Sequence, residues 1–188
     1  MCIRDSYYMG LCYQHQDMML DALEEYRTAI KLDSKLLDAR IALGKAQAQR
    51  LQVEEAIEQF KRVVAMDPQR LDVQLALGEA YLKQGAARQA LRVLTRAYRK
   101  NRKFPGLAYL VGRAYHDQDK ISRATKFYQE AVRLNPRDPM PHYYLGYVYK
   151  AGRRNRQAIS EFRRYLQLRP DAPDADDVRE EIDYLLNE

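Results

Sequence analysis

The sequence contains no tryptophan, two cysteines, eight glycines and seven prolines among its 188 residues. Cys2 and Cys12 are too few for a disulfide framework, and the three histidines are too scattered for a local metal site. The scarcity of glycine and proline argues against a turn-dense β-rich domain or a low-complexity linker. No uninterrupted apolar run approaches the roughly 18 residues of a membrane-spanning helix. The length is that of one ordinary folded domain.

Five of the eight glycines recur every 34 residues without an insertion, and such self-similarity indicates a repeat architecture. These repeat glycines are Gly10, Gly44, Gly78, Gly112 and Gly146. Twelve residues after each stands an alanine, and four residues later comes a large apolar side chain. The alanines are Ala22, Ala56, Ala90, Ala124 and Ala158, and the large residues are Tyr26, Phe60, Leu94, Tyr128 and Phe162.

The apolar spacing within one repeat predicts two helices joined by a short polar turn. In the fourth repeat, Ala108, Val111 and Tyr115 mark one apolar helical stripe, and a second stripe begins at Ala124. Small residues at the glycine and alanine positions would let the two helices approach closely. The dipeptides Asp67-Pro68 and Asp138-Pro139 predict an acidic N-cap followed by proline at the first helical position.

This pattern of an apolar residue, glycine, tyrosine, a later alanine, an aromatic residue and a closing proline resembles the tetratricopeptide repeat (TPR) family. The resemblance implies an all-α, right-handed superhelical TPR solenoid of five helix-turn-helix repeats with a C-terminal capping helix. A 34-residue unit also argues against the pentatricopeptide family, whose unit is one residue longer. The expected boundaries are repeats at 3–36, 37–70, 71–104, 105–138 and 139–172, followed by a capping helix at 173–188.

One position departs from the family pattern in every repeat. Four residues before each repeat glycine, in what we call the leading slot, the family places an aromatic residue. The residues there are Ser6, Arg40, Gln74, Ala108 and His142. These replacements should loosen individual contacts without changing the register of the repeats.

The two ends of the chain differ in character. The stripe of Ala175, Val178, Ile182 and Leu185 predicts a terminal helix that covers the last repeat, with acids in its first turn where the helix dipole favours them. Residues 1–6 resemble the translated transposase adapter used in making sequencing libraries. They are therefore expected to be a non-native leader on a truncated bacterial TPR protein from environmental DNA, and the compartment stays open.

The sequence offers no convincing catalytic or metal-binding constellation. A nucleophile needs a base within hydrogen-bond reach, and a metal needs several converging ligands. Cys12 occupies the slot of Ala46 and Ala80 and is expected to be a small packing residue. The glycines sit inside helices and do not form a phosphate-binding loop. We therefore expect neither enzymatic activity nor a cofactor or metal.

One face of each repeat's first helix is expected to bind a partner. Residues three before, one after and four after each repeat glycine lie about 130° from the packed stripe, and the family resemblance implies that this groove face lines a concave binding surface. It is apolar and aromatic with a polar margin, which suits an extended or helical peptide. The candidates at these positions are Tyr7, Ile41, Lys45, Leu75, Glu79, Tyr109, Arg113, His116, Tyr143, Tyr147 and Lys150, and Lys83, one position beyond the row, is added to them. The Lys and Asn residues with which some family members grip a C-terminal carboxylate are absent at the matching positions.

Charge is unevenly distributed around the net value of +6, which comes from 32 Lys and Arg against 26 Asp and Glu. No acid occurs between Ala80 and His116, whereas residues 171–188 carry eight acids and one arginine. A basic stripe is expected on the third repeat's second helix and the residues that follow it. It consists of Arg88, Arg92, Arg96, Arg99, Arg102 and Lys103.

Three functions remain open at this stage. The expected one is a non-catalytic scaffold for a protein partner, and an acidic partner and self-association are both left open. The alternative is the regulatory repeat portion of an enzyme, such as a transferase or a kinase, whose catalytic domain lies upstream. Nucleic-acid binding through the basic stripe is weaker, because aromatic residues interleave poorly with the arginines.

Overall fold

The computed structural model describes residues 3–187, and within this range the chain forms eleven α-helices and no β-strand. It divides into two compact units, one ending at Ala97 and the other beginning at Tyr98. The predicted all-helical fold is confirmed. No helix in the described range is long and apolar enough to cross a membrane. Residues 1 and 2 of the expected leader lie outside the described residues.

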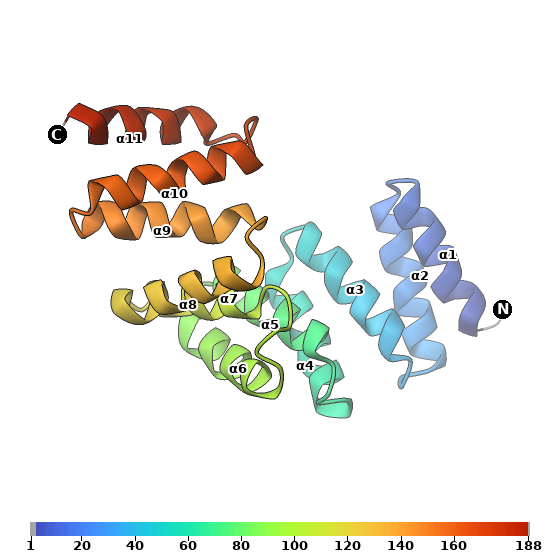
Figure 1. The fold of residues 1–188 in the computed structure, drawn as a ribbon. Coiled ribbons are helices and arrows are strands. Elements are labelled where there is room, and N and C mark those ends of the chain that lie inside the picture. The colour runs from blue at the N-terminus through green and yellow to red at the C-terminus, as the bar shows by residue number, and fades with distance from the viewer. Residues whose placement is uncertain (1–2, 188) are drawn as a thin grey trace. The chain divides into compact units, whose positions relative to one another are not determined.

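Helices that follow one another in the sequence pack together within each unit (Figure 1). The first unit contains α1 (Ile3–His15), α2 (Met19–Leu32), α3 (Leu37–Gln49), α4 (Val53–Met66), α5 (Leu71–Lys83) and most of α6 (Ala87–Lys100). The second contains α7 (Leu107–His116), α8 (Ile121–Leu134), α9 (Pro139–Ala151), α10 (Asn155–Leu168) and α11 (Ala175–Asn187).

The repeat glycines permit the close approach of paired helices, as the sequence predicted. A Cβ atom added to Gly146 would lie 2.3 Å from Phe162 Cε1, and one added to Gly78 would lie 2.3 Å from Leu94 Cδ2. The five large residues that face these glycines are each no more than 2% exposed, and the five repeat alanines are fully buried. Each repeat thus fits one large side chain of its second helix against the bare backbone of its first.

The turn inside each repeat contains a residue in the left-handed conformation, again every 34 residues. These are Asp17, Leu51, Gly85, Asp119 and Arg153, with φ between 54° and 78°. Only the third repeat uses glycine, which adopts this conformation without steric cost. Leu51 carries the cost of a Cβ atom there while its side chain is 78% exposed, so the leucine gains little from packing.

Replacing Leu51 by glycine should therefore stabilise the protein. We expect Leu51→Gly to raise the free energy of unfolding by about 0.5–1 kcal/mol, because the strain exceeds the entropy that glycine loses. Urea denaturation followed by circular dichroism measures this change. Leu51→Ala is the control, since alanine keeps the Cβ atom. An equal gain in the alanine variant would show that strain at φ is not the cause.

The turns between repeats follow a second rule that the sequence analysis missed. Asp33, Asp67, Asn101 and Asn135 stand 34 residues apart, and the side-chain oxygen of each accepts a hydrogen bond from the backbone N–H two residues later, at 2.8–3.2 Å. These local bonds stabilise a turn in place of a helix.

The N-cap prediction is therefore half right. Asp138 caps α9 by accepting a hydrogen bond from Met140 N at 3.1 Å, with Pro139 at the helix start. Asp67-Pro68 was wrongly assigned, because α5 begins only at Leu71. Asp67 aligns with Asn135 in the repeat register and forms the turn.

In the second, third and fifth repeats, a polar residue in the leading slot bonds to the turn before the repeat. The Gln74 amide donates to the Pro68 carbonyl at 2.8 Å, and the Arg40 guanidinium reaches the Ser34 carbonyl at 3.0 and 3.1 Å. His142 Nε2 lies 3.3 Å from the Pro136 carbonyl, and its Nδ1 lies 2.6 Å from Glu161 Oε2. All three side chains are buried. In each case the carbonyl lies six residues before the slot, and the side chain gives this backbone acceptor a partner.

The fourth repeat lacks this fastening because Ala108 has no side-chain donor. The helix that contains it, α7, is also shorter, with ten residues against thirteen in α5 and α9. It follows Gly106, whose φ is 80°.

Substitutions at His142 test how much the leading-slot contact contributes to the free energy of unfolding. His142→Ala should lower the free energy of unfolding by about 1–3 kcal/mol, because it leaves the carbonyl and the Glu161 carboxylate without this partner. His142→Gln should keep more than half of that stability, since Gln74 shows that an amide reaches the same carbonyl. Chemical denaturation measures the free energy of unfolding of both variants. Equal losses would mean that side-chain volume, and not the hydrogen bond, matters.

Helix α11 covers the last repeat through the stripe that the sequence predicted. Its four stripe residues are each no more than 7% exposed, and the helix packs against α10 (Figure 1). The Tyr165 hydroxyl donates to Asp174 at 2.5 Å and ties the preceding loop to α10. Cys12, in contrast, is exposed, so its predicted packing role is wrong. In the described chain no helix pair precedes α1 to cover this slot.

Candidate functional site

The groove face lies on the first helix of each repeat, and its residues are divided between the two units. In the first unit it is discontinuous. Ile41 is 6% exposed and belongs to the hydrophobic core, so it offers little surface to a partner. Tyr7 and Leu75 are half-buried, Lys45 is exposed, and Lys83 Nζ lies 3.9 Å from Glu79 Oε1.

In the second unit three predicted residues line one cavity. His116 at the end of α7 and Tyr147 and Lys150 of α9 surround a volume of about 370 Å³. Its wall is completed by apolar surface from Ile121, Val148 and Ala151. The geometry therefore joins residues that are more than 30 positions apart in the sequence.

Tyr144 is the centre of an aromatic cluster beside this cavity. Its ring stacks on that of Tyr128 at 5.3 Å between centroids and 20° between planes. The rings of Tyr109 and His116 lie 5.9 and 5.8 Å away, and the Arg113 guanidinium carbon lies 5.8 Å from the ring centre. The sequence analysis did not single out Tyr144. Its only signal was its place beside Tyr143, since the matching residues in the second to fourth repeats are aliphatic.

Two buried polar atoms in this cluster have no hydrogen-bond partner among the described residues. They are Arg113 Nε and the hydroxyl oxygen of the fully buried Tyr128. Leaving such groups unpaired costs about 1–3 kcal/mol each. A cationic donor beside aromatic rings is suited to an anionic or carbonyl oxygen of a ligand.

A second group of rings supports the other end of the face. Tyr147 packs edge-on against Phe162 at 4.9 Å, and Tyr143 lies 5.0 Å from Tyr147 and 5.1 Å from Tyr165. Lys150 forms an ion pair with Glu181 of α11, and its ammonium lies 5.4 Å from the centre of the Tyr184 ring. The capping helix therefore holds one wall of the cavity in place.

Burial raises the pKa of two tyrosines on the groove face. It is the main cause that raises the pKa of Tyr109 and of Tyr147 above the ordinary value near 10, and the neighbouring Tyr144 and Tyr143 add to the respective shifts. Both side chains therefore remain neutral and can donate a hydrogen bond throughout the physiological range.

The same effect predicts how stability depends on alkaline pH. Burial raises the pKa of Tyr26 to about 12 and that of Tyr165 to about 12, the latter with help from Asp174. Because an unfolded tyrosine loses its proton near pH 10, the folded state holds more protons above that pH. The free energy of unfolding should thus be unaffected below pH 10 and fall between pH 10 and about 12.

Urea denaturation across this range measures the fall, and Tyr26→Phe should reduce its slope. The variant also loses the 2.7 Å hydrogen bond from Tyr26 to Gln14, which lowers stability at every pH without changing the slope. Tyr8→Phe is the control, since its ring is 59% exposed. If the free energy of unfolding of Tyr26→Phe falls with pH as steeply as that of the original protein, the raised pKa of Tyr26 does not cause the fall.

The six residues of the basic stripe are all exposed. Arg88, Arg92, Arg96 and Arg99 lie on α6, and Arg102 and Lys103 follow it. The structure places none of them in the aromatic cluster. Within the described residues no group of three or more His, Cys, Asp or Glu side chains could hold a metal ion.

Comparison with protein families gives the class to which this architecture belongs. Four tetratricopeptide repeat models match residues 20–70, 52–114, 112–151 and 142–172, which together cover most of the chain. The chain belongs to the tetratricopeptide repeat family, whose members commonly serve as protein-interaction scaffolds. No curated protein sequence matches it.

Solved structures show the same fold at low sequence identity. The TPR protein TTC0263 of Thermus thermophilus is 23% identical, with a TM-score of 0.73 and 100% of both chains covered. Residues 41 to the end of MamA from Desulfovibrio magneticus RS-1 are 19% identical, with a TM-score of 0.81 and coverage of 91% of this chain and 97% of that one. YrrB, described as a TPR protein with an unusual peptide-binding site, is 18% identical, with a TM-score of 0.72 and coverage of 93% and 90%.

Proposed function

We propose that this protein is a non-catalytic scaffold that binds a segment of a partner protein on the groove face of α7 and α9. One observation carries the proposal: His116, Tyr147 and Lys150, which belong to the row predicted from helix geometry and the family resemblance, line a single cavity of about 370 Å³. Concave, mostly apolar sites with a few polar groups are the usual places of ligand binding.

The side chains define the chemistry of the bound segment. An apolar side chain of the partner would fill the cavity against Tyr147, Val148 and Ile121. An acidic side chain or a backbone carbonyl would pair with Arg113, whose buried Nε has no partner among the described residues. An acidic residue next to an apolar one is thus the preferred motif.

Rigid rings reduce the cost of binding. Tyr143 and Tyr147 are held by edge-on and tilted contacts with Phe162 and Tyr165, so the protein orders few side chains when the partner arrives. Tyrosine also offers a large contact area with few rotatable bonds. The family membership supports this function, and the unusual peptide-binding site of YrrB is an example of a similar fold that serves it.

A peptide library displayed on phage and selected against the whole protein tests the proposal. We expect the enriched peptides to combine an acidic and an apolar residue. Arg113→Ala and Tyr147→Ala should each weaken their binding at least about tenfold, as fluorescence anisotropy measures, because central arginine and tyrosine contacts commonly carry about 2 kcal/mol or more.

The matched control is Arg163→Ala, an exposed arginine on α10 outside the groove face. It should leave the affinity unchanged. Circular dichroism checks that each variant is folded. If the enriched peptides bind folded Arg113→Ala and Tyr147→Ala as tightly as the original protein, the groove assignment is wrong.

A further inference from the structure

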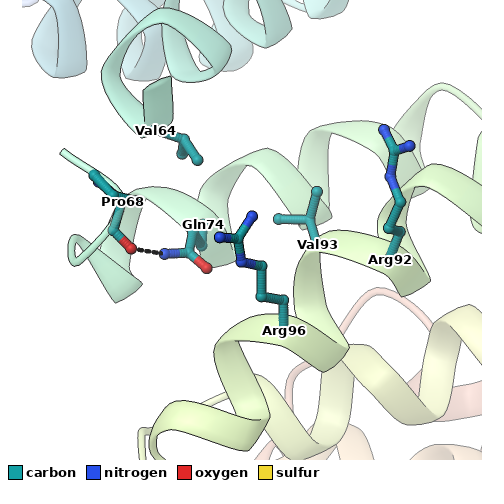
Figure 2. A pocket seen from close by; sticks show the side chains of 6 residues that line it. All are labelled: Val64, Pro68, Gln74, Arg92, Val93 and Arg96. Carbon is teal, nitrogen blue, oxygen red and sulfur yellow. Dashed lines mark hydrogen bonds between the residues drawn. The ribbon is translucent and has the colours of Figure 1, made fainter. Parts of the chain in front are cut away.

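A second cavity lies in the first unit. We call it the outer pocket. It has a volume of about 320 Å³ and is lined by Val64, Pro68, Gln74, Arg92, Val93 and Arg96. Figure 2 shows Arg96 extending from α6 toward Gln74, while Arg92 projects from the preceding turn of the same helix.

The pocket exists because of one substitution in the repeat pattern. In the second and fifth repeats, the leading-slot side chain meets a polar residue of the second helix: Arg40 lies 3.3 Å from Gln59, and His142 lies 2.6 Å from Glu161. The matching residue of α6 is Val93, which is shorter and apolar. Gln74 donates backwards to the Pro68 carbonyl, as Figure 2 shows. The apolar side chains of Val64 and Val93 therefore remain partly exposed in an open pocket at the surface.

Two arginines at the rim of the pocket carry charge that nothing in the described structure neutralises. Arg92 and Arg96 are exposed, and no ion pair joins either of them to another described residue. The nearest acids in the sequence are Glu79 and Asp117. With Arg88 and Arg99 they form one stripe along about 16 Å of α6, at about 1.5 Å per residue. Guanidinium groups in such a row favour carboxylates.

The chain itself contains a helix with the complementary chemistry. On α11, Asp177, Glu180 and Asp183 are exposed and have no ion-pair partner among the described residues. Tyr184 lies on the same face and is 54% exposed. The acids and this ring span about 10 Å along the helix, which fits within the arginine stripe. The buried stripe of α11 points to α10, so Asp177, Glu180 and Asp183 face away from that contact.

We propose that the outer pocket and the arginine stripe of α6 bind the acidic face of α11 from a second copy of this chain. Carboxylates of α11 pair with Arg92 and Arg96, and an apolar side chain of the same face covers Val64 and Val93. Because α6 and α11 are different surfaces, the contact is heterologous, and each copy can donate one surface and accept at the other. The protein therefore associates head to tail.

Sedimentation velocity of the whole protein tests this association. At about 100 µM protein and about 50 mM NaCl we expect species larger than a monomer, whose share grows with concentration. At about 500 mM NaCl the apparent affinity should fall at least about tenfold, since the pairs are exposed and screened. A monomer at low salt and high concentration overturns the proposal.

Neutralising variants identify the two surfaces. Arg92→Gln/Arg96→Gln removes the acceptor, and Glu180→Gln/Asp183→Asn removes the donor, so each variant alone should be monomeric. A mixture of the two should form a one-to-one complex, because each variant retains the surface that the other lacks. Arg156→Gln/Arg163→Gln on α10 makes the same change of charge and should still associate.

The remaining outcomes are equally decisive. Association that survives in Arg92→Gln/Arg96→Gln would place the contact elsewhere and overturn the proposal. A monomer that binds a single-stranded RNA of about 20 nucleotides at low salt, and loses this binding with Arg92 and Arg96, would assign the stripe to nucleic acid instead. Neither result bears on peptide binding by Arg113 and Tyr147, so failures of the two proposals are distinguishable.

Discussion

Contact between a bare stretch of helix backbone and one large side chain sets the geometry of this protein. Each repeat glycine receives a tyrosine, phenylalanine or leucine from the partner helix, at distances that leave no room for a Cβ atom. This contact fixes the separation of the two helices in a pair. The other features, which include the turn conformations, the leading slot and the groove face, follow from the register that it imposes.

Variation between repeats is concentrated where this register allows it. In the leading slot, the second, third and fifth repeats place a hydrogen-bonding side chain, and the fourth places Ala108. The partner position on the second helix likewise varies between polar and apolar residues. One combination, Gln74 with Val93, leaves a pocket at the surface. Another, His142 with Glu161, forms a hydrogen-bonded polar pair. A strict packing rule thus coexists with local chemical diversity.

The sequence was sufficient to predict what depends on this packing. The helix pairs, the glycine contacts and the buried stripe of α11 follow from apolar spacing, which is the same in every repeat. It was insufficient where a backbone conformation is shared by unlike residues. The left-handed turn position holds Asp, Leu, Gly or Arg, so no single residue type predicts this conformation. Asp67 was misplaced because Asp-Pro serves both as a cap and as a turn.

For the candidate site, helix geometry and the family resemblance selected a row of residues that includes His116, Tyr147 and Lys150, but they could not predict burial set by neighbouring helices. Ile41 is buried and Cys12 is exposed. The ring of Tyr144, on α9, contacts rings from α7 and α8. Each of these depends on contacts with the adjacent repeat, which differ along the chain.

The packing of each helix against its neighbours in the sequence also determines how the protein can fold. Within each unit nearly all helix contacts join consecutive helices, so the residues that meet are seldom far apart along the chain. The contact order is therefore low, and little loop entropy opposes the first tertiary contacts. Folding can begin at any well-packed helix pair and spread to its neighbours, with no strand pairing or long-range closure to delay it.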